Sequence, residues 1–208
     1  MKRVAVTGLG VISPVGNDVP TFWNALCSGT CGIGPITKFD ATDYPVKLAA
    51  EVHDFDPKQY MEKLDILHSD VYTHFAMAAA CQAVADSGIA GTLDAERVGV
   101  YIGSGIGGIA TFMTEHSKLL NRGPRRVSPY FIPMMIPNMA SSMIAIRYHF
   151  HGPAMPMVTA FFGIASIAPF RSPIALEVRV SRLMVRTRVC SAANSSAVSS
   201  SCASLNAR

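Results

Sequence analysis

A short apolar run at residues 155–160 constrains the fold of this chain more than any other feature. Such a run is typical of a strand that is buried on both faces in the sheet of an α/β protein. In these proteins, reactive side chains are usually presented at the carboxyl end of a strand. The residue that follows the run is Phe161, so its identity bears directly on the chemistry that the chain can perform.

The composition of the chain changes abruptly at that residue. Residues 1–160 hold twelve basic and thirteen acidic groups, whereas residues 161–208 hold six Arg, one Glu and ten Ser but no Lys and no Asp. Residues 191–201 form a low-complexity polar tract, which is typical of disorder in water. Such a change of composition at a single residue is what an out-of-frame reading of the coding DNA produces. We therefore predict a folded domain of residues 1–160 and an unrelated, disordered or frameshifted tail of residues 161–208.

The charge, hydropathy and cysteine patterns argue against several classes of protein. The net charge of +4 arises wholly in the tail, which lacks the Lys clusters and interleaved aromatic residues of a nucleic-acid-binding arm. No run of eighteen apolar residues is present, so we expect no membrane span. The five cysteines are odd in number and lack CxxC spacing, which is typical of a reducing cytoplasm rather than of a disulfide framework or a zinc site. The six histidines form no metal-ligand pattern, and we expect no metal and no cofactor.

Hydrophobic periodicity and capping residues predict alternating strands and helices. Strands are predicted at residues 3–11, 48–52, 98–102 and 154–160, the first of them running into a glycine-rich turn. Helices are predicted after a cap at Asn17 or Asp18, weakly after Pro57, from Ser69 or Asp70 to Gly88, over residues 109–120, and from Asn138 toward His149. Residues 128–137 contain three prolines and are predicted not to form a regular helix. This order indicates an α/β fold with a mostly parallel sheet flanked by helices.

Two glycine clusters invite comparison with nucleotide-binding sites. Residues 8–13 fall one glycine short of the dinucleotide fingerprint, whereas residues 103–108 match GxGxxG between a predicted strand and a predicted helix. The acidic residue expected about twenty positions later is missing, because residues 122–126 contain no carboxylate. The sequence therefore favours glycines that permit a tight turn and close backbone packing over a dinucleotide site.

Five motifs occur in order along residues 1–160. They are Val6-Thr7-Gly8-Leu9-Gly10, Ile102-Gly103-Ser104-Gly105-Ile106-Gly107-Gly108, Ser128-Pro129-Tyr130-Phe131-Ile132-Pro133, Asn138-Met139-Ala140 and Val158-Thr159-Ala160. Together they resemble the amino-terminal half of a β-ketoacyl-acyl carrier protein synthase of the second, elongating type. The resemblance implies the first half of a thiolase-like layered fold. It also implies acyltransferase chemistry in fatty-acid biosynthesis, the decarboxylative Claisen condensation of acyl-carrier protein with malonyl-carrier protein.

The resemblance implies roles for three residues. In the family, the Val-Thr-Ala strand is followed at once by the nucleophilic cysteine, and here Phe161 occupies that position. The family's two catalytic histidines and its lysine lie in the other half of the fold, and no histidine of this sequence matches their motifs. We therefore assign no catalytic residue and expect a truncated, inactive chain. By the same resemblance, Ile106 lines the fatty-acyl channel, and Phe131 reaches it from the neighbouring subunit of a homodimer.

Several alternatives stay open on the sequence alone. Ile106 and Phe131 are simply core residues if their large apolar side chains pack inside the half-domain. An intact enzyme is disfavoured by Phe161. A non-catalytic partner of the chain-length-factor kind resembles ketosynthases and lacks the cysteine, and a regulatory tail grafted on a half-domain is a further interpretation. The preferred interpretation is an inert fragment.

Overall fold

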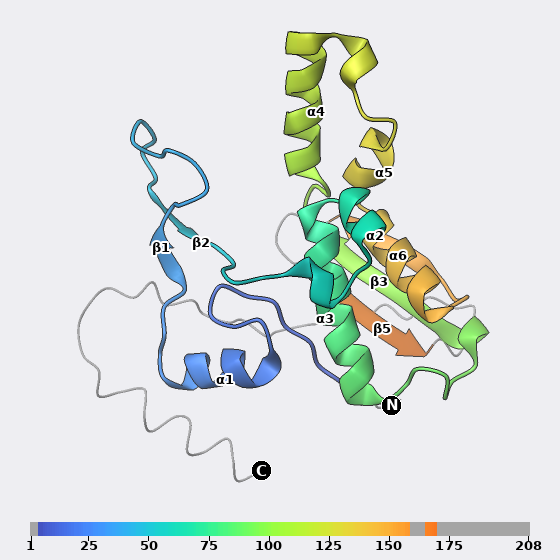
Figure 1. Cartoon of the computed structure of the whole chain (residues 1–208). Helices are drawn as coiled ribbons and strands as arrows, with labels where there is room; N and C mark the ends of the chain where they lie inside the picture. The colour runs from blue at the N-terminus through green and yellow to red at the C-terminus, as the bar shows by residue number, and fades with distance from the viewer. Residues whose placement is uncertain (1–3, 159–164, 170–208) are drawn as a thin grey trace.

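Figure 1 shows the chain as a computed structural model, which describes residues 4–158 and 165–169. The predictions for Phe161 and for residues 191–201 lie outside these ranges. The elements in chain order are α1 (Val19–Cys27), β1 (Ile33–Pro35), β2 (Leu48–Ala50), η1 (Pro57–Gln59), α2 (Lys63–Leu67), α3 (Val71–Ser87), η2 (Ala95–Arg97), β3 (Val98–Ser104), α4 (Ile109–Arg122), η3 (Pro124–Arg126), α5 (Phe131–Met135), α6 (Met139–Tyr148), β4 (Ala154–Val158) and β5 (Ala165–Pro169).

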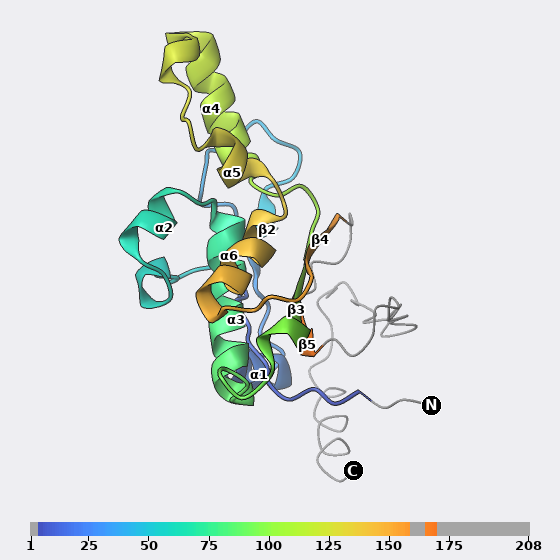
Figure 2. The same cartoon turned by 90° about the vertical axis from the view of Figure 1, so that its right-hand side faces the viewer.

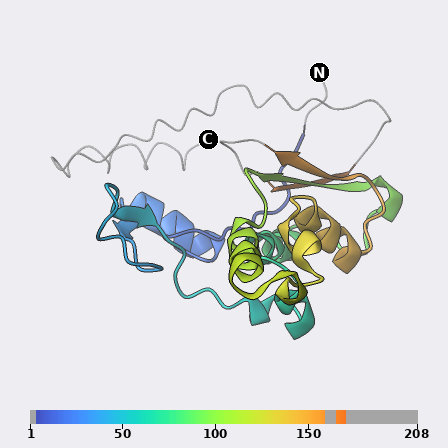
Figure 3. The same cartoon turned by 90° about the horizontal axis from the view of Figure 1, so that it is seen from above.

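Strand β3 is the centre of the larger sheet, whose strand order is β4-β3-β5. It runs parallel to β4 and antiparallel to β5, so that Val100 lies opposite Ala154 on one side and Ile167 on the other. Helices α3 and α6 lie on one face of this sheet (Figure 3). The predicted α/β architecture is therefore confirmed, and β3 and β4, which correspond to the third and fourth predicted strands, pair in parallel.

The hydrophobic core lies between β3 and the two helices α3 and α6. Val98 and Val100 of β3 and Ile144 of α6 are at most 1% exposed. Helix α3 begins at its predicted cap, Asp70, and ends at Gly88 in the left-handed conformation (φ 62°), which glycine adopts without steric cost. Local capping signals thus set both ends of the helix that supports the sheet.

Helices α4 and α5 form a projection, residues 109–135, that we call the α4–α5 arm. Figures 1 and 2 show the arm extending away from the sheet and from α6. The prediction of α4 is confirmed, and the helix continues to Arg122. The prediction that residues 128–137 form no regular helix is wrong for α5, which contains Pro133 as its third residue. One turn forms because an N–H in the first turn of a helix has no helical partner to lose.

The prediction of an amino-terminal strand is wrong, because residues 4–12 belong to no strand. The segment instead runs alongside α3 and bonds to its side chains. The N–H of Leu9 donates to Asp86 Oδ2 (2.9 Å), and the N–H of Val11 donates to Gln82 Oε1 (3.0 Å). The edge of β3 opposite β4 is held by β5, a strand that the sequence did not predict.

Strand β4 forms as predicted, but it is not the buried strand that its apolar run indicates. Met155 and Met157 are each 52% exposed, and Val158 is 64% exposed. The physical reason is its place at the edge of the described sheet, where β3 pairs with one side of it and α6 packs against it. Its remaining apolar surface is open to solvent.

The smaller elements agree with local signals in the sequence. Helix α1 begins at Asp18, whose carboxylate accepts the N–H of Thr21 (2.8 Å). Strands β1 and β2 pair antiparallel, so the predicted strand at residues 48–52 is confirmed in shorter form. Short helices η1 and α2 follow Pro57, where a weak helix is predicted. Among the described residues, no helix combines the length and the apolar character that crossing a membrane requires.

Candidate functional site at the base of the α4–α5 arm

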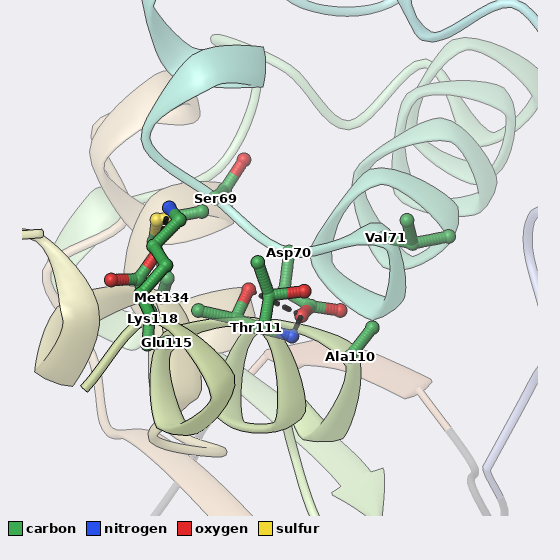
Figure 4. A pocket seen from close by; sticks show the side chains of 9 residues that line it. Ser69, Asp70, Val71, Ala110, Thr111, Glu115, Lys118 and Met134 are labelled. Carbon is green, nitrogen blue, oxygen red and sulfur yellow. Dashed lines mark hydrogen bonds and ion pairs between the residues drawn. The ribbon is translucent and has the colours of Figure 1, made fainter. Parts of the chain in front are cut away.

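A cavity of about 290 Å³ lies where the amino-terminal end of α3 meets the α4–α5 arm. Figure 4 shows the side chains that face it from three elements. It is lined by Ser69, Asp70, Val71, Ala110, Thr111, Thr114, Glu115, Lys118 and Met134. The lining combines two buried carboxylates with small and apolar side chains, so the organisation of the site depends on what satisfies those carboxylates.

The Asp70 carboxylate joins the beginnings of two helices. One of its oxygens, Oδ2, accepts hydrogen bonds from the N–H (2.8 Å) and the hydroxyl (2.6 Å) of Thr111, in the first turn of α4. Its other oxygen accepts the N–H of Tyr72 in α3 at 3.4 Å. The residue is only 6% exposed. Because the first turn of a helix carries unpaired N–H groups and a partial positive charge, one carboxylate stabilises both helix ends.

Glu115 holds the arm together one turn further along α4. Its carboxylate accepts a hydrogen bond from Lys118 Nζ (2.6 Å) and another from the N–H of Ser128 (2.7 Å), which precedes α5. The hydrogen bond from Lys118 lowers the pKa of Glu115 most, and the bond from the Ser128 backbone lowers it further. Glu115 therefore stays ionised and fixes the return of the chain from α4 toward α5.

Two aromatic contacts and a buried histidine complete the base of the arm. The hydroxyl of Tyr72 donates to the carbonyl of Ile136 (2.6 Å), and the His68 ring stacks on Tyr130 with ring centroids 3.8 Å apart. His74 Nε2 lies 3.1 Å from the Ser69 hydroxyl. Burial lowers the pKa of His74, so its ring favours the neutral form. The His68–Tyr130 contact joins the end of α2 to the arm, and the Tyr72 bond joins α3 to the residue that follows the arm.

The glycine cluster at residues 103–108 is packed against α5. The N–H of Gly108 donates to the carbonyl of Met135 (2.9 Å), and a Cβ added at Gly108 would lie 2.3 Å from the carbonyl oxygen of Met134. A phosphate at this turn would meet carbonyl oxygens, and the start of α4 already holds the Asp70 carboxylate. The structure therefore supports close packing as the role of these glycines and disfavours a dinucleotide site.

Neither Ile106 nor Phe131, the residues assigned to the acyl channel by resemblance, lines the cavity. Ile106 is 66% exposed in the turn between β3 and α4. Phe131 is half-buried at the start of α5, and its ring lies against that of Phe112 with centroids 6.1 Å apart. Phe161 lies outside the described residues. The assignments of Ile106 and Phe131 to an acyl channel stay predictions.

Sequence reasoning recognised Asp70 only as a helix cap and missed its contact with Thr111. The two residues are 41 positions apart, so no local pattern joins them. One sequence signal could have found this contact. Asp70 is an acidic cap, and the helix that follows Gly108 has no capping side chain of its own. Residues 4–158 and 165–169 contain no group of three or more His, Cys, Asp or Glu side chains placed to hold a metal ion.

Comparison with known proteins identifies the family to which this architecture belongs. Residues 1–161 match the family described as "Beta-ketoacyl synthase, N-terminal domain". The chain is 49% identical over 160 residues to the 3-oxoacyl-[acyl-carrier-protein] synthase 2 of Coxiella burnetii, a match that covers 76% of this chain and 39% of that protein. It is 45% identical over 160 residues to the synthase 2 of Synechocystis, with 76% and 38% covered. The chain thus spans well under half the length of these relatives.

Solved structures show the same fold. The ishigamide ketosynthase/chain length factor superposes with a TM-score of 0.67 at 28% identity, over 74% of this chain and 39% of that one. A beta-ketoacyl synthase from Burkholderia phymatum superposes with a TM-score of 0.62 at 21% identity, over 77% and 40%. The thiolase-like layered fold expected from the motifs is thereby confirmed. On the family match and these relatives, the chain belongs to the beta-ketoacyl synthase family, and its residues 1–161 correspond to the N-terminal domain.

Proposed function

We propose that residues 1–160 are the amino-terminal half-domain of a 3-oxoacyl-[acyl-carrier-protein] synthase of fatty-acid elongation. The observation that carries the proposal is the 49% identity over 160 residues to a curated protein of that name. The reaction class is a decarboxylative Claisen condensation, in which a thiolate takes the acyl group from a carrier thioester and the malonyl-derived carbanion then attacks it. By the same similarity, the partner is an acyl carrier protein that carries acyl or malonyl groups. We place the protein in the cytoplasm.

The polypeptide itself is proposed to be inactive in this condensation. The acylation step needs a nucleophile directly after Val158-Thr159-Ala160, and a phenyl ring at Phe161 can neither form a thiolate nor accept an acyl group. No histidine of the sequence matches the motifs of the two family histidines that support decarboxylation. Since members of such a catalytic group act together, Phe161→Cys alone gains little.

The decisive assay supplies the purified protein with acyl-carrier and malonyl-carrier protein and follows the 3-oxoacyl product. We expect no product above the blank without enzyme, for the natural chain and for Phe161→Cys. The control is a preparation that has been cleared of host synthase and reassayed. Turnover that survives this clearance overturns the proposed inactivity.

We further propose that residues 161–208 are a non-homologous tail produced by a shifted reading frame. The family match ends at residue 161, and the composition changes there. Sequencing the coding DNA across codon 161 tests this directly. The proposal fails if no single-base insertion or deletion restores a frame that continues the ketosynthase pattern.

The proposed acyl-channel roles of Ile106 and Phe131 require a homodimer, because Phe131 acts across the subunit interface. The arm that carries Phe131 exposes apolar side chains, including Met113 at 58% and Leu120 at 71%. Light scattering of the natural chain and of Phe131→Ala tests the dimer. A monomer in both preparations would contradict the assignment of Phe131.

A second candidate is a non-catalytic partner of the chain-length-factor kind. It is favoured by the superposition on the ishigamide ketosynthase/chain length factor and by the absence of cysteine at Phe161. A partner of this kind binds an intact ketosynthase and alters the length of its products. Co-elution with an intact synthase and a changed product length would favour this candidate over the inert half-domain.

A further inference from the structure

The start of helix α5 depends on Ser128, a residue that precedes the helix. The N–H of Phe131 donates to the carbonyl of Ser128 (3.0 Å), and the N–H of Tyr130 donates to the Ser128 hydroxyl (3.2 Å). The first N–H groups of a helix have no partner inside it, so acceptors that precede the helix decide where it begins. The place of Ser128 therefore fixes the backbone from which the Phe131 side chain extends.

Ser128 is in turn held by Glu115 of α4. The N–H of Ser128 donates to Glu115 Oε2 (2.7 Å), a bond that spans 13 positions of the sequence. The other oxygen of Glu115 accepts Lys118 Nζ (2.6 Å), a pair that Figure 4 shows at the cavity. The Glu115 side chain is only 6% exposed. A hydrogen bond to a buried carboxylate is stronger than one between neutral groups, so the position of Ser128 follows that of Glu115.

The ring of Phe131 is placed by a second residue of α4. Helices α4 and α5 lie side by side (Figures 1 and 2). The rings of Phe131 and Phe112 have centroids 6.1 Å apart and planes inclined by 34°, and Phe112 stacks on His116 with centroids 6.0 Å apart. Phe112 and Glu115 are three positions apart and are therefore neighbours on the surface of α4. One stretch of α4 thus contacts both the ring of Phe131 and the residue that holds its backbone.

We propose that Glu115 is a positioning residue for the selection of acyl chains, because it fixes Ser128 and thereby the place at which Phe131 presents its ring. This inference rests on the proposed role of Phe131 in the acyl channel. A hydrophobic channel selects chains by the space that its lining leaves, so a displaced ring changes the chain length that fits. Glu115 acts on the acyl chain only through Ser128 and Phe131.

Fluorine NMR of the full 208-residue chain, with para-fluorophenylalanine in place of Phe131, tests the positioning. In Glu115→Ala, the fluorine signal should move by more than its line width toward its position in urea. Glu115→Gln keeps a side-chain oxygen that accepts the N–H of Ser128, so it should restore the natural position. The matched control is Glu96→Ala, which removes a carboxylate bonded to His151 outside the arm (3.1 Å) and should leave the signal in place.

A second reporter separates positioning from a general loss of structure. Phe150 is 7% exposed in the core and stacks on Tyr148, so para-fluorophenylalanine at that position reports the fold as a whole. In Glu115→Ala, its signal should stay where it is in the natural chain. Movement of both signals would show that Glu115 is merely structural and would overturn the proposal. An unmoved signal at Phe131, or equal movement in Glu115→Ala and Glu115→Gln, also overturns it.

A second variant keeps the test decisive if Glu115→Ala does not fold. Ser128→Ala keeps the backbone bond to Glu115 and loses the hydroxyl that accepts the N–H of Tyr130. The amide of Tyr130 should then exchange about tenfold faster or more, and the fluorine signal at Phe131 should move while that at Phe150 stays. An unmoved signal at Phe131 would contradict the relay through Ser128.

Light scattering of the same samples distinguishes a failure of this inference from a failure of the proposed function. A dimer in which the Phe131 signal ignores Glu115→Ala would contradict the role of Glu115 and leave the acyl-channel role of Phe131 standing. A monomer would contradict that acyl-channel role, and with it the selection of acyl chains by Glu115, even where the Phe131 signal responds. A dimer with a responsive signal supports both.

Discussion

Replacing Asp70 by alanine should destabilise the fold far more than removing an exposed helix cap with the same bonding pattern. Asp70→Ala leaves two donors of Thr111 unpaired at a site where Asp70 is 6% and Thr111 is 9% exposed. A hydrogen bond to a charged group is worth about 1.5–3 kcal/mol, and loss of a cap adds about 1 kcal/mol. Because both strong bonds share one oxygen, we expect a combined loss of roughly 4 kcal/mol in the free energy of unfolding.

Asp18 provides the matched control. Its carboxylate also accepts the N–H and the hydroxyl of a threonine, Thr21, both at 2.8 Å, but Asp18 is exposed. Water can replace the lost partner there, so Asp18→Ala should cost much less than Asp70→Ala. Thr111→Val keeps the backbone bond to Asp70 and loses the hydroxyl bond, for which we expect about 1–1.5 kcal/mol.

Thermal unfolding followed by circular dichroism measures these differences. For a chain of this size, 1 kcal/mol corresponds to a shift of about 2–4 °C in Tm, so Asp70→Ala should lower Tm by roughly 8–16 °C. Asp18→Ala should lower Tm by only a small part of that shift. Equal shifts for Asp70→Ala and Asp18→Ala would refute the argument that burial makes the Asp70 contact costly to lose.

Three further predictions concern packing and pH. Gly108→Ala should lower the free energy of unfolding in urea by about 2 kcal/mol, because the added Cβ meets a carbonyl oxygen of α5. Gly34→Ala, whose Cβ would have nothing within 4 Å, should be close to neutral. Equal costs for the two variants would contradict the close packing of Gly108 against α5. Burial holds the folded pKa of His74 below 6.5, so the unfolded chain binds the proton more readily and stability should fall as pH drops through 6.5. His74→Gln should flatten this part of the curve of stability against pH. An unchanged slope would show that His74 is not the source of the pH dependence. The hydrogen bond from Lys118 holds the folded pKa of Glu115 below 4.5, so the contribution of Glu115 to stability is present above pH 4.5 and is lost as pH falls further. Glu115→Gln should reduce this loss of stability in acid. The same loss in both proteins would contradict the role of Glu115.

The parts of the fold that were predictable from sequence depend on contacts within a few residues. Helix α3 is the best example, because Asp70 and Gly88 define its ends through bonds to their own neighbours. The periodicity of residues 98–102 likewise predicted β3, whose residues Val98 and Val100 are buried. In both cases, the residues that decide the structure lie inside the element or directly at its ends.

The parts that could not be predicted depend on distant partners. The apolar run of β4 indicates burial, yet nothing in the run shows that the strand lies at an edge of the described sheet. Residues 4–12 have the pattern of a strand, but pairing requires a free edge of β3, which β5 holds. The candidate site is of the same kind, since Asp70 and Thr111 meet only after two helices have packed.

The length of α4 makes the far end of the α4–α5 arm sensitive to any rotation of the helix at its contact with Asp70. At the usual rise of an α-helix, roughly 16 Å separate Thr111, which bonds to Asp70, from Arg122 at the far end of α4. A rotation of about 10° at that contact would therefore displace the end by roughly 3 Å, about the length of a hydrogen bond. A change in the packing of Gly108 against α5 that rotates α4 would therefore move the far end of the helix further than its start. The positions of Arg122, Arg125 and Arg126 at the far end therefore depend on the contacts at the start of α4.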